Sequence, residues 1–196
     1  MGLDMWLESA PKSFLKNKDK EITSEEWDTT DELAYWRKAN CVHRWFLSNC
    51  KPLGRGSEEF RRVTKSDLVR FKSIIKNVLK YAFAIHHKEN DDNIDSKFDM
   101  PVYELNNIGF KRINKNKIGV NLKAKHIDPT AFDLELSDEG IDIAESLLPT
   151  EDGFFFGSTK YDSGYVSDLI DTYNIINNIL DSDVFKYNIV FYYPWW

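Results

Sequence analysis

Strand-like segments lie near both ends of this 196-residue chain, and no other feature constrains the fold as much. Residues 3–8 place Leu3, Met5 and Leu7 on one side of the backbone, which is the two-residue period of a half-buried strand. Residues 187–193 are aromatic and β-branched, a composition that favours a strand. The two segments indicate a sheet rather than an all-helical fold.

Three long segments between these strands have helical periodicity. One spans about 30–49 and follows the capping-box pattern of Thr29 and Glu32. Another spans about 65–86 and follows the same pattern at Thr64 and Asp67. A third spans about 163–180, and a shorter helix is expected over 137–148. We therefore predict an α+β fold with a mixed or mainly antiparallel sheet and about three main helices on one face.

A β-rich region is expected within this arrangement. Four short apolar runs lie between residues 101 and 136 and are separated by asparagine-rich turns. They predict strands over 102–105, 109–113, 118–122 and 132–136. Residues 89–99 are acidic and rich in asparagine, which is typical of an exposed loop. The whole chain, 1–196, is thus expected to form one domain with a hairpin or meander inserted at about 98–136.

The composition indicates a cytoplasmic protein. Hydrophobic residues make up 42% of the chain, which is enough to form a core, but no apolar run is long enough to cross a membrane. Cys41 and Cys50 are too far apart on the expected first helix to form a disulfide. No Cys/His spacing suggests zinc, so neither a metal nor a cofactor is expected. The oligomeric state is left open.

Charge is divided into blocks along the chain. Residues 51–88 and 110–125 are basic, whereas residues 127–152 contain no lysine or arginine. The blocks either neutralise each other within the fold or present faces of opposite sign to partners. Lys72, Lys76 and Lys80 would form a basic row for nucleic acid, but the net charge of −6 disfavours that partner. The candidate partner-binding residues are Asp133, Glu135, Asp138, Glu139 and the aromatic Trp196.

The segment 147–162 is the first candidate for a ligand site. Gly153 and Gly157 bracket three phenylalanines, which predict a buried strand over 154–156. Ser158 and Thr159 would follow this strand and precede a helix, the position at which hydroxyl and N–H groups bind phosphate. Alternatively, their hydroxyls cap the next helix.

The expected first helix holds a second candidate. Trp36, Asn40 and His43 would project together, with Arg37 beside them. His43 could act as a general base with Tyr161 or Asp162, or it could be a core histidine that needs hydrogen-bond partners. No nucleophile is evident, so no catalytic residue is assigned and an enzyme is the less favoured class. The candidate ligand-binding residues are Trp36, Arg37, Asn40, His43, Ser158, Thr159, Tyr161 and Asp162.

Three motifs in order carry a family resemblance. They are MGLDM at residues 1–5, YWRKAN at 35–40, and LLPT with GFFFGST and YD across 147–162. This combination resembles a family of small proteins of tailed bacteriophages and prophages that has no assigned catalytic residues. The resemblance covers roughly half of the chain, and residues 98–136 depart from it.

The resemblance implies a phage setting for the function. The leading expectation is an accessory protein that binds a host protein, such as a defence factor, and modulates or inhibits it without catalysis. The alternative is a protein that binds or hydrolyses a nucleotide or another phosphate ligand through residues 36–43 and 157–162. Direct binding of nucleic acid is a third, disfavoured hypothesis.

Overall fold

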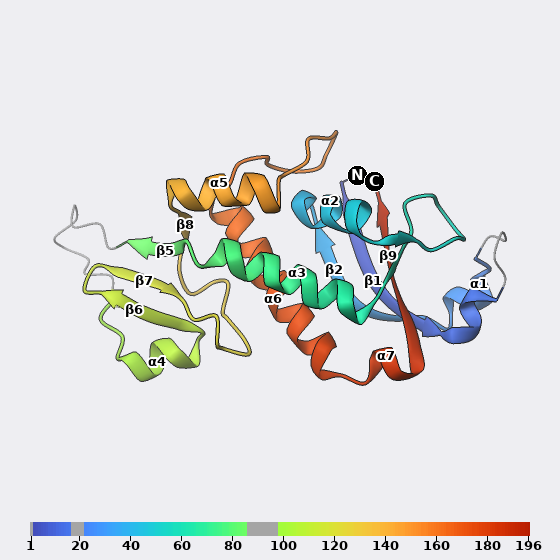
Figure 1. Ribbon diagram of the computed structural model, residues 1–196, viewed down its shortest axis with the longest axis horizontal. Coiled ribbons are helices and arrows are strands. Elements are labelled where there is room, and N and C mark those ends of the chain that lie inside the picture. The colour runs from blue at the N-terminus through green and yellow to red at the C-terminus, as the bar shows by residue number, and fades with distance from the viewer. Residues whose placement is uncertain (1, 17–21, 86–97) are drawn as a thin grey trace. The chain divides into compact units, whose positions relative to one another are not determined.

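The computed structural model describes residues 2–16, 22–85 and 98–196 and has the predicted α+β architecture (Figure 1). Every strand pairing in it is antiparallel. The chain forms two compact units, each with its own sheet. Unit 1 comprises Met1–Lys72, Leu148–Thr159 and Ile175–Trp196, and unit 2 comprises Ser73–Leu147 and Lys160–Asn174.

The five-stranded sheet of unit 1 contains both predicted end strands. Its order is β2-β1-β9-β4-β3, so β9 lies at the centre and pairs with β1 from Asp4↔Trp195 to Pro11↔Asn188. The strands are β1 Asp4–Pro11, β2 Asp31–Arg37, β3 Lys51–Pro52, β4 Arg61–Val63 and β9 Asn188–Trp195.

Aromatic side chains fill the core of unit 1 next to helix α2, Asn40–Asn49. The Phe46 ring stacks on that of Tyr192 at 4.5 Å between centroids, and Trp45 stacks on Phe71 at 4.0 Å. Cys41 and Cys50 are free cysteines, as predicted, and the side chains of both are buried. The other helices that contribute to this unit are the 3₁₀ helix η1 Lys12–Leu15, α1 Ser24–Trp27, the start of α3 Lys65–Leu79, the end of α6 Ser163–Asp181, and α7 Val184–Tyr187.

The helix predicted over 30–49 is wrong in its first half. Residues 31–37 form β2, in which Ala34 and Trp36 face the core and pair with Leu7 and Met5 of β1. Lys38 then takes a positive φ of 62°, and α2 begins at Asn40. Pairing with β1 overrides the local helical pattern because sheet contacts outweigh intrinsic propensity. Trp36 therefore lies on a different element from Asn40 and His43.

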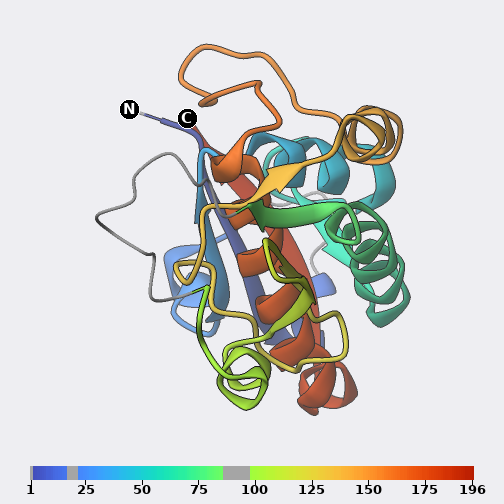
Figure 2. The same cartoon turned by 90° about the vertical axis from the view of Figure 1, so that its left-hand side faces the viewer.

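Unit 2 contains a four-stranded sheet of order β6-β7-β5-β8. The predicted inserted region supplies β6, β7 and β8, and Figure 2 shows the β6–β7 hairpin with α4 below it. The elements are β5 Ala82–Ile85, α4 Val102–Asn107, β6 Phe110–Asn114, β7 Lys117–Val120, β8 Glu135–Leu136 and α5 Asp138–Leu147.

Two predictions for unit 2 are wrong. Residues 102–105 belong to helix α4, whose N-cap is Pro101: the Pro101 carbonyl accepts from Leu105 N at 3.2 Å, and the buried Leu105 fixes one face of the helix. The second predicted helix ends at Leu79 rather than residue 86, and its last apolar residues form β5. The part of the predicted 89–99 loop before residue 98 lies outside the described residues. No helix in the described ranges is both long and apolar enough to cross a membrane.

Candidate functional site

The segment 148–159, here called the Gly-Phe loop, is not the buried strand that its phenylalanines predict. Phe154 is 82% exposed and Phe155 is 51% exposed, and Phe155 has a positive φ of 71°. A hydrogen bond from Phe156 N to Gly153 O, 3.1 Å long, closes a tight turn around them. The turn directs Phe154 and Phe155 to solvent, while Phe156 is half-buried.

Asn40 holds the Gly-Phe loop against the start of α2. Its side chain is buried, and its Nδ2 donates to Phe156 O at 3.1 Å and Ser158 O at 2.8 Å. Its Oδ1 accepts from Glu151 N at 3.2 Å. Both polar ends of the amide are thus engaged by the loop backbone. The sequence-based requirement that a buried Asn40 find hydrogen bonds is met, and the partners are backbone groups of the loop.

Further contacts fix the loop on the junction between β2 and α2. Leu3 N donates to Phe155 O at 3.4 Å, and Arg44 Nη1 donates to Thr150 O at 3.2 Å. Gly157 has a φ of 95°, and a Cβ on it would lie 3.0 Å from both Cβ and O of Lys38. Only glycine suits both that conformation and that spacing. The close approach explains why a glycine follows the phenylalanine run.

His43 is a buried core histidine in this structure. Its Nδ1 lies 2.7 Å from the Tyr192 hydroxyl, and its ring meets Phe156 and Trp196 edge-on at 5.3 and 5.4 Å. Burial, with a smaller contribution from the Arg61 charge, lowers the pKa of His43 to about 4. The ring is therefore neutral near pH 7, and its hydrogen-bond partner is Tyr192.

The other ligand-site candidates have separate surroundings. Trp36 is buried against Phe46, and exposed Arg37 has its Nε 3.8 Å from an Asp4 carboxylate oxygen. In unit 2, Asp162 Oδ1 accepts from the backbone N–H groups of Gly164 and Tyr165 at 3.1 and 3.2 Å and so caps α6. The cap is therefore Asp162, rather than the Ser158 or Thr159 hydroxyl considered as an alternative.

Ser158 and Thr159 are exposed, and their backbone carbonyls take part in hydrogen bonds that hold the Gly-Phe loop. The carbonyl of Ser158 accepts from Asn40, and that of Thr159 accepts from Thr150 Oγ1 at 3.1 Å. The Tyr161 ring packs against Tyr165 in unit 2, with centroids 4.9 Å apart. Within the described residues, no group of three or more His, Cys, Asp or Glu side chains could hold a metal ion.

The candidate partner-binding residues are at the surface. Asp133, Glu135, Asp138 and Glu139 are exposed in unit 2, and Glu139 Oε1 accepts from Tyr81 Oη at 3.1 Å. Trp196 is 43% exposed in unit 1, where its ring also packs on Phe156 at 5.6 Å. In the predicted basic row, Lys80 is exposed and donates to Asn77 Oδ1, whereas Lys72 and Lys76 are half-buried.

The exposed phenylalanine pair is the feature that sequence reasoning missed. The Phe154 and Phe155 rings lie 4.1 Å apart between centroids and form a small aromatic tip on the Gly-Phe loop. Three consecutive phenylalanines resemble a buried strand by hydropathy, and only the flanking glycines signal a turn. The chain matches no protein-family model, no curated protein and no solved structure.

Proposed function

We propose that this chain is a phage-encoded accessory protein that binds a host protein, such as a defence factor, and modulates or inhibits it without catalysis. The observation that carries the proposal is the aromatic tip of Phe154 and Phe155, which is exposed on a loop held in place by Asn40. The phage setting comes from the motif resemblance. The protein-binding role comes from the physical properties of the tip.

Exposed aromatic side chains of this size favour association with another protein. Burying one phenylalanine side chain contributes roughly 1.5–3 kcal/mol, and aromatic residues often supply much of the energy of an interface. The tip is also ordered before binding, because three hydrogen bonds connect Asn40 to the loop backbone. A preordered loop loses less conformational entropy when a partner covers it.

The same contacts disfavour the nucleotide or phosphate alternative. That site would use the Asn40 amide, the His43 imidazole and the Asp162 carboxylate. Asn40 is bonded to the loop, His43 is buried beside Tyr192, and Asp162 caps α6. A binding role thus agrees better with these contacts than a catalytic one.

A comparison of matched surface variants tests the proposal. The tagged full chain, the double variant Phe154→Ser/Phe155→Ser and the control Tyr187→Ser would each be incubated with lysate of a host strain. Tyr187 is also an exposed aromatic residue of unit 1, at 62% exposure, but it lies on α7. We expect one stoichiometric partner with the unmodified chain and with the control, and its loss with the double variant.

The contribution of the two rings to binding is then measured as a dissociation constant with the purified partner. Removing both rings should weaken the dissociation constant at least about 100-fold, because each ring contributes more than about 1.4 kcal/mol. Unchanged unfolding midpoints would show that both variants fold. Full binding by the double variant would refute the role of the tip. Flotation with phosphatidylglycerol vesicles that depends on Phe154 and Phe155 would instead assign the tip to lipid.

A further inference from the structure

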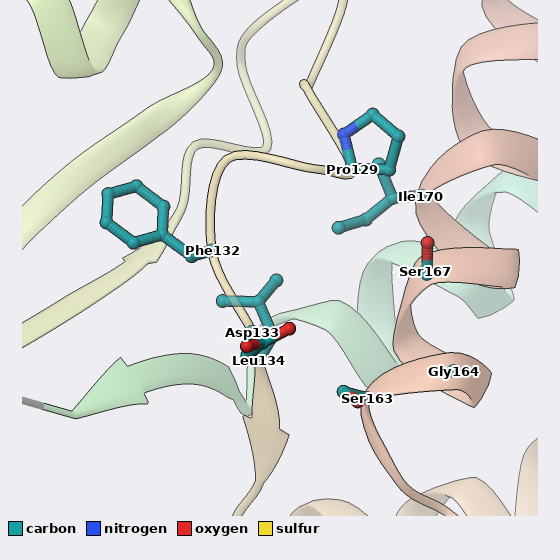
Figure 3. A pocket seen from close by; sticks show the side chains of 8 residues that line it. All are labelled: Pro129, Phe132, Asp133, Leu134, Ser163, Gly164, Ser167 and Ile170. Carbon is teal, nitrogen blue, oxygen red and sulfur yellow. The ribbon is translucent and has the colours of Figure 1, made fainter. Parts of the chain in front are cut away.

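Unit 2 contains a cavity of 170 Å³ that lies outside the Gly-Phe loop and shares only Asp133 with the candidate residues described above (Figure 3). It lies between the segment that precedes β8 and the first turns of α6. Its lining residues are Pro129, Phe132, Asp133, Leu134, Ser163, Gly164, Ser167 and Ile170. A protein cavity of about 150 Å³ accommodates benzene, so this one has room for a side chain or a short alkyl chain.

The cavity has an apolar part and a polar part. Pro129, Leu134 and Ile170 supply apolar surface, and Leu134 extends toward Ile170 in Figure 3. Asp133 lies opposite the first turns of α6, with one carboxylate oxygen on the α6 side, and Ser163 and Ser167 project from α6 (Figure 3). A matching ligand therefore combines a short apolar chain with a polar head that donates hydrogen bonds.

The charges around the cavity determine whether the polar head of the ligand is cationic or anionic. A helix N-terminus normally attracts anions, but the Asp162 carboxylate already accepts from Gly164 N and Tyr165 N. Residues 127–152, which supply one wall, contain no lysine or arginine. Burial raises the pKa of Asp168, the next residue of α6 after Ser167, to about 7, and the charges of Asp171 and Asp162 make smaller contributions in the same direction. A cationic head suits these surroundings and an anionic one does not.

We propose that this cavity binds an alkylammonium or alkylguanidinium group. The Asp133 carboxylate would pair with the charge, and the hydroxyls of Ser163 and Ser167 would accept its remaining N–H groups. The alkyl stem would lie against Leu134 and Ile170. This chemistry is shared by the lysine and arginine side chains of a protein and by free diamines. The proposal does not depend on the aromatic tip.

Amide chemical shifts of the ¹⁵N-labelled full chain test the proposal directly. The cationic probes are Nα-acetyl-lysine methylamide, Nα-acetyl-arginine methylamide and putrescine, and the uncharged probe is Nα-acetyl-norleucine methylamide. We expect the cationic probes to shift the amides of Asp133, Gly164 and Ser167 saturably, and the norleucine probe to bind at least about tenfold more weakly. Tighter binding of the amino-acid probes assigns the site to a protein side chain, and tighter binding of putrescine assigns it to a free amine.

Two variants with the same change in charge distinguish binding in the cavity from nonspecific electrostatic attraction of the cationic probes. Asp133→Asn should weaken binding of the cationic probes about tenfold or more, because it removes the charged hydrogen-bond acceptor. Asp142→Asn removes an exposed carboxylate of α5 in the same unit, outside the cavity lining, and should leave binding unchanged. Equal weakening by both variants, equal binding of norleucine, or no saturable shift with any cation would overturn the proposal. None of these results bears on the partner captured by the aromatic tip.

Discussion

Replacement of Asn40 should release the Gly-Phe loop without unfolding the sheet beneath it. In Asn40→Ala, the carbonyls of Phe156 and Ser158 and the N–H of Glu151 all lose their partner. Each hydrogen bond contributes about 0.5–1.5 kcal/mol net, and water can reach part of the loop once it opens. We therefore expect a loss of about 2 kcal/mol, which corresponds to about a 30-fold increase in the open population.

Native-state proteolysis measures this opening. Chymotrypsin cleaves after phenylalanine, but it needs several residues of extended backbone, which the bonds from Asn40 prevent. When opening and closing are fast, the cleavage rate at Phe154 and Phe155 follows the open population, so Asn40→Ala should be cleaved about 30-fold faster. Hydrogen exchange of the Glu151 amide should accelerate by a similar factor.

Two further variants test whether the Asn40 amide holds the Gly-Phe loop in place. Asn40→Asp keeps the shape but places a carboxylate against two carbonyl oxygens, so it should open the loop more than alanine does. Asn49→Ala removes a single bond to Trp45 O near the end of α2 and should leave loop cleavage unchanged. If Asn40→Ala lowers the urea midpoint yet is cleaved at the original rate, the amide stabilises α2 alone and does not hold the loop.

The buried His43 and the half-buried Asp168 give opposite pH dependences. His43 has a pKa lowered from 6.5 to about 4, so the unfolded chain binds the extra proton and stability should fall by roughly 3 kcal/mol as pH drops through that window. Urea unfolding at pH 7 and pH 4 measures it, and a His43→Gln variant with the same pH dependence would contradict the assignment. Asp168 has a pKa raised from 3.8 to about 7, so the folded state holds the proton and stability falls as pH rises through that range. Asp168→Asn should therefore raise the unfolding free energy at pH 8, by at most roughly 4 kcal/mol, and change it little at pH 4. Equal effects at both pH values would contradict that sign.

The local helix signals in the sequence were only partly reliable. The capping box at Thr64 and Asp67 is present, with Asp67 N bonded to Thr64 Oγ1 at 3.2 Å, and it starts α3 as predicted. The same pattern at Thr29 and Glu32 starts no helix, because Glu32 already lies in β2 and pairs with Glu8 of β1. A complete capping box instead lies at Thr23 and Glu26, where it starts the short helix α1. The difference is tertiary, because only the pairing of residues 31–37 with β1 decides between helix and strand.

For the candidate site, the sequence indicated which buried side chains require hydrogen bonds, but it did not indicate which groups form those bonds. It showed that Asn40 and His43 would require hydrogen bonds if buried, and both are buried and bonded. Their partners, in the Gly-Phe loop and in β9, are more than 100 positions away in the chain. No local pattern relates residues at such separation. The exposure of Phe154 and Phe155 was unpredictable for the same reason, since it follows from how Asn40 and Gly157 seat the loop.

The central place of β9 has a consequence for synthesis in the cell. Of the described strands, β9 is the last to leave the ribosome, yet it alone joins β1 and β2 to β3 and β4. Until residues 188–195 emerge, β1 exposes an unpaired edge that can pair with other chains. The nascent chain thus depends on rapid closure or on chaperones for its solubility. A premature stop before residue 188 would yield an aggregation-prone fragment rather than a shortened functional protein.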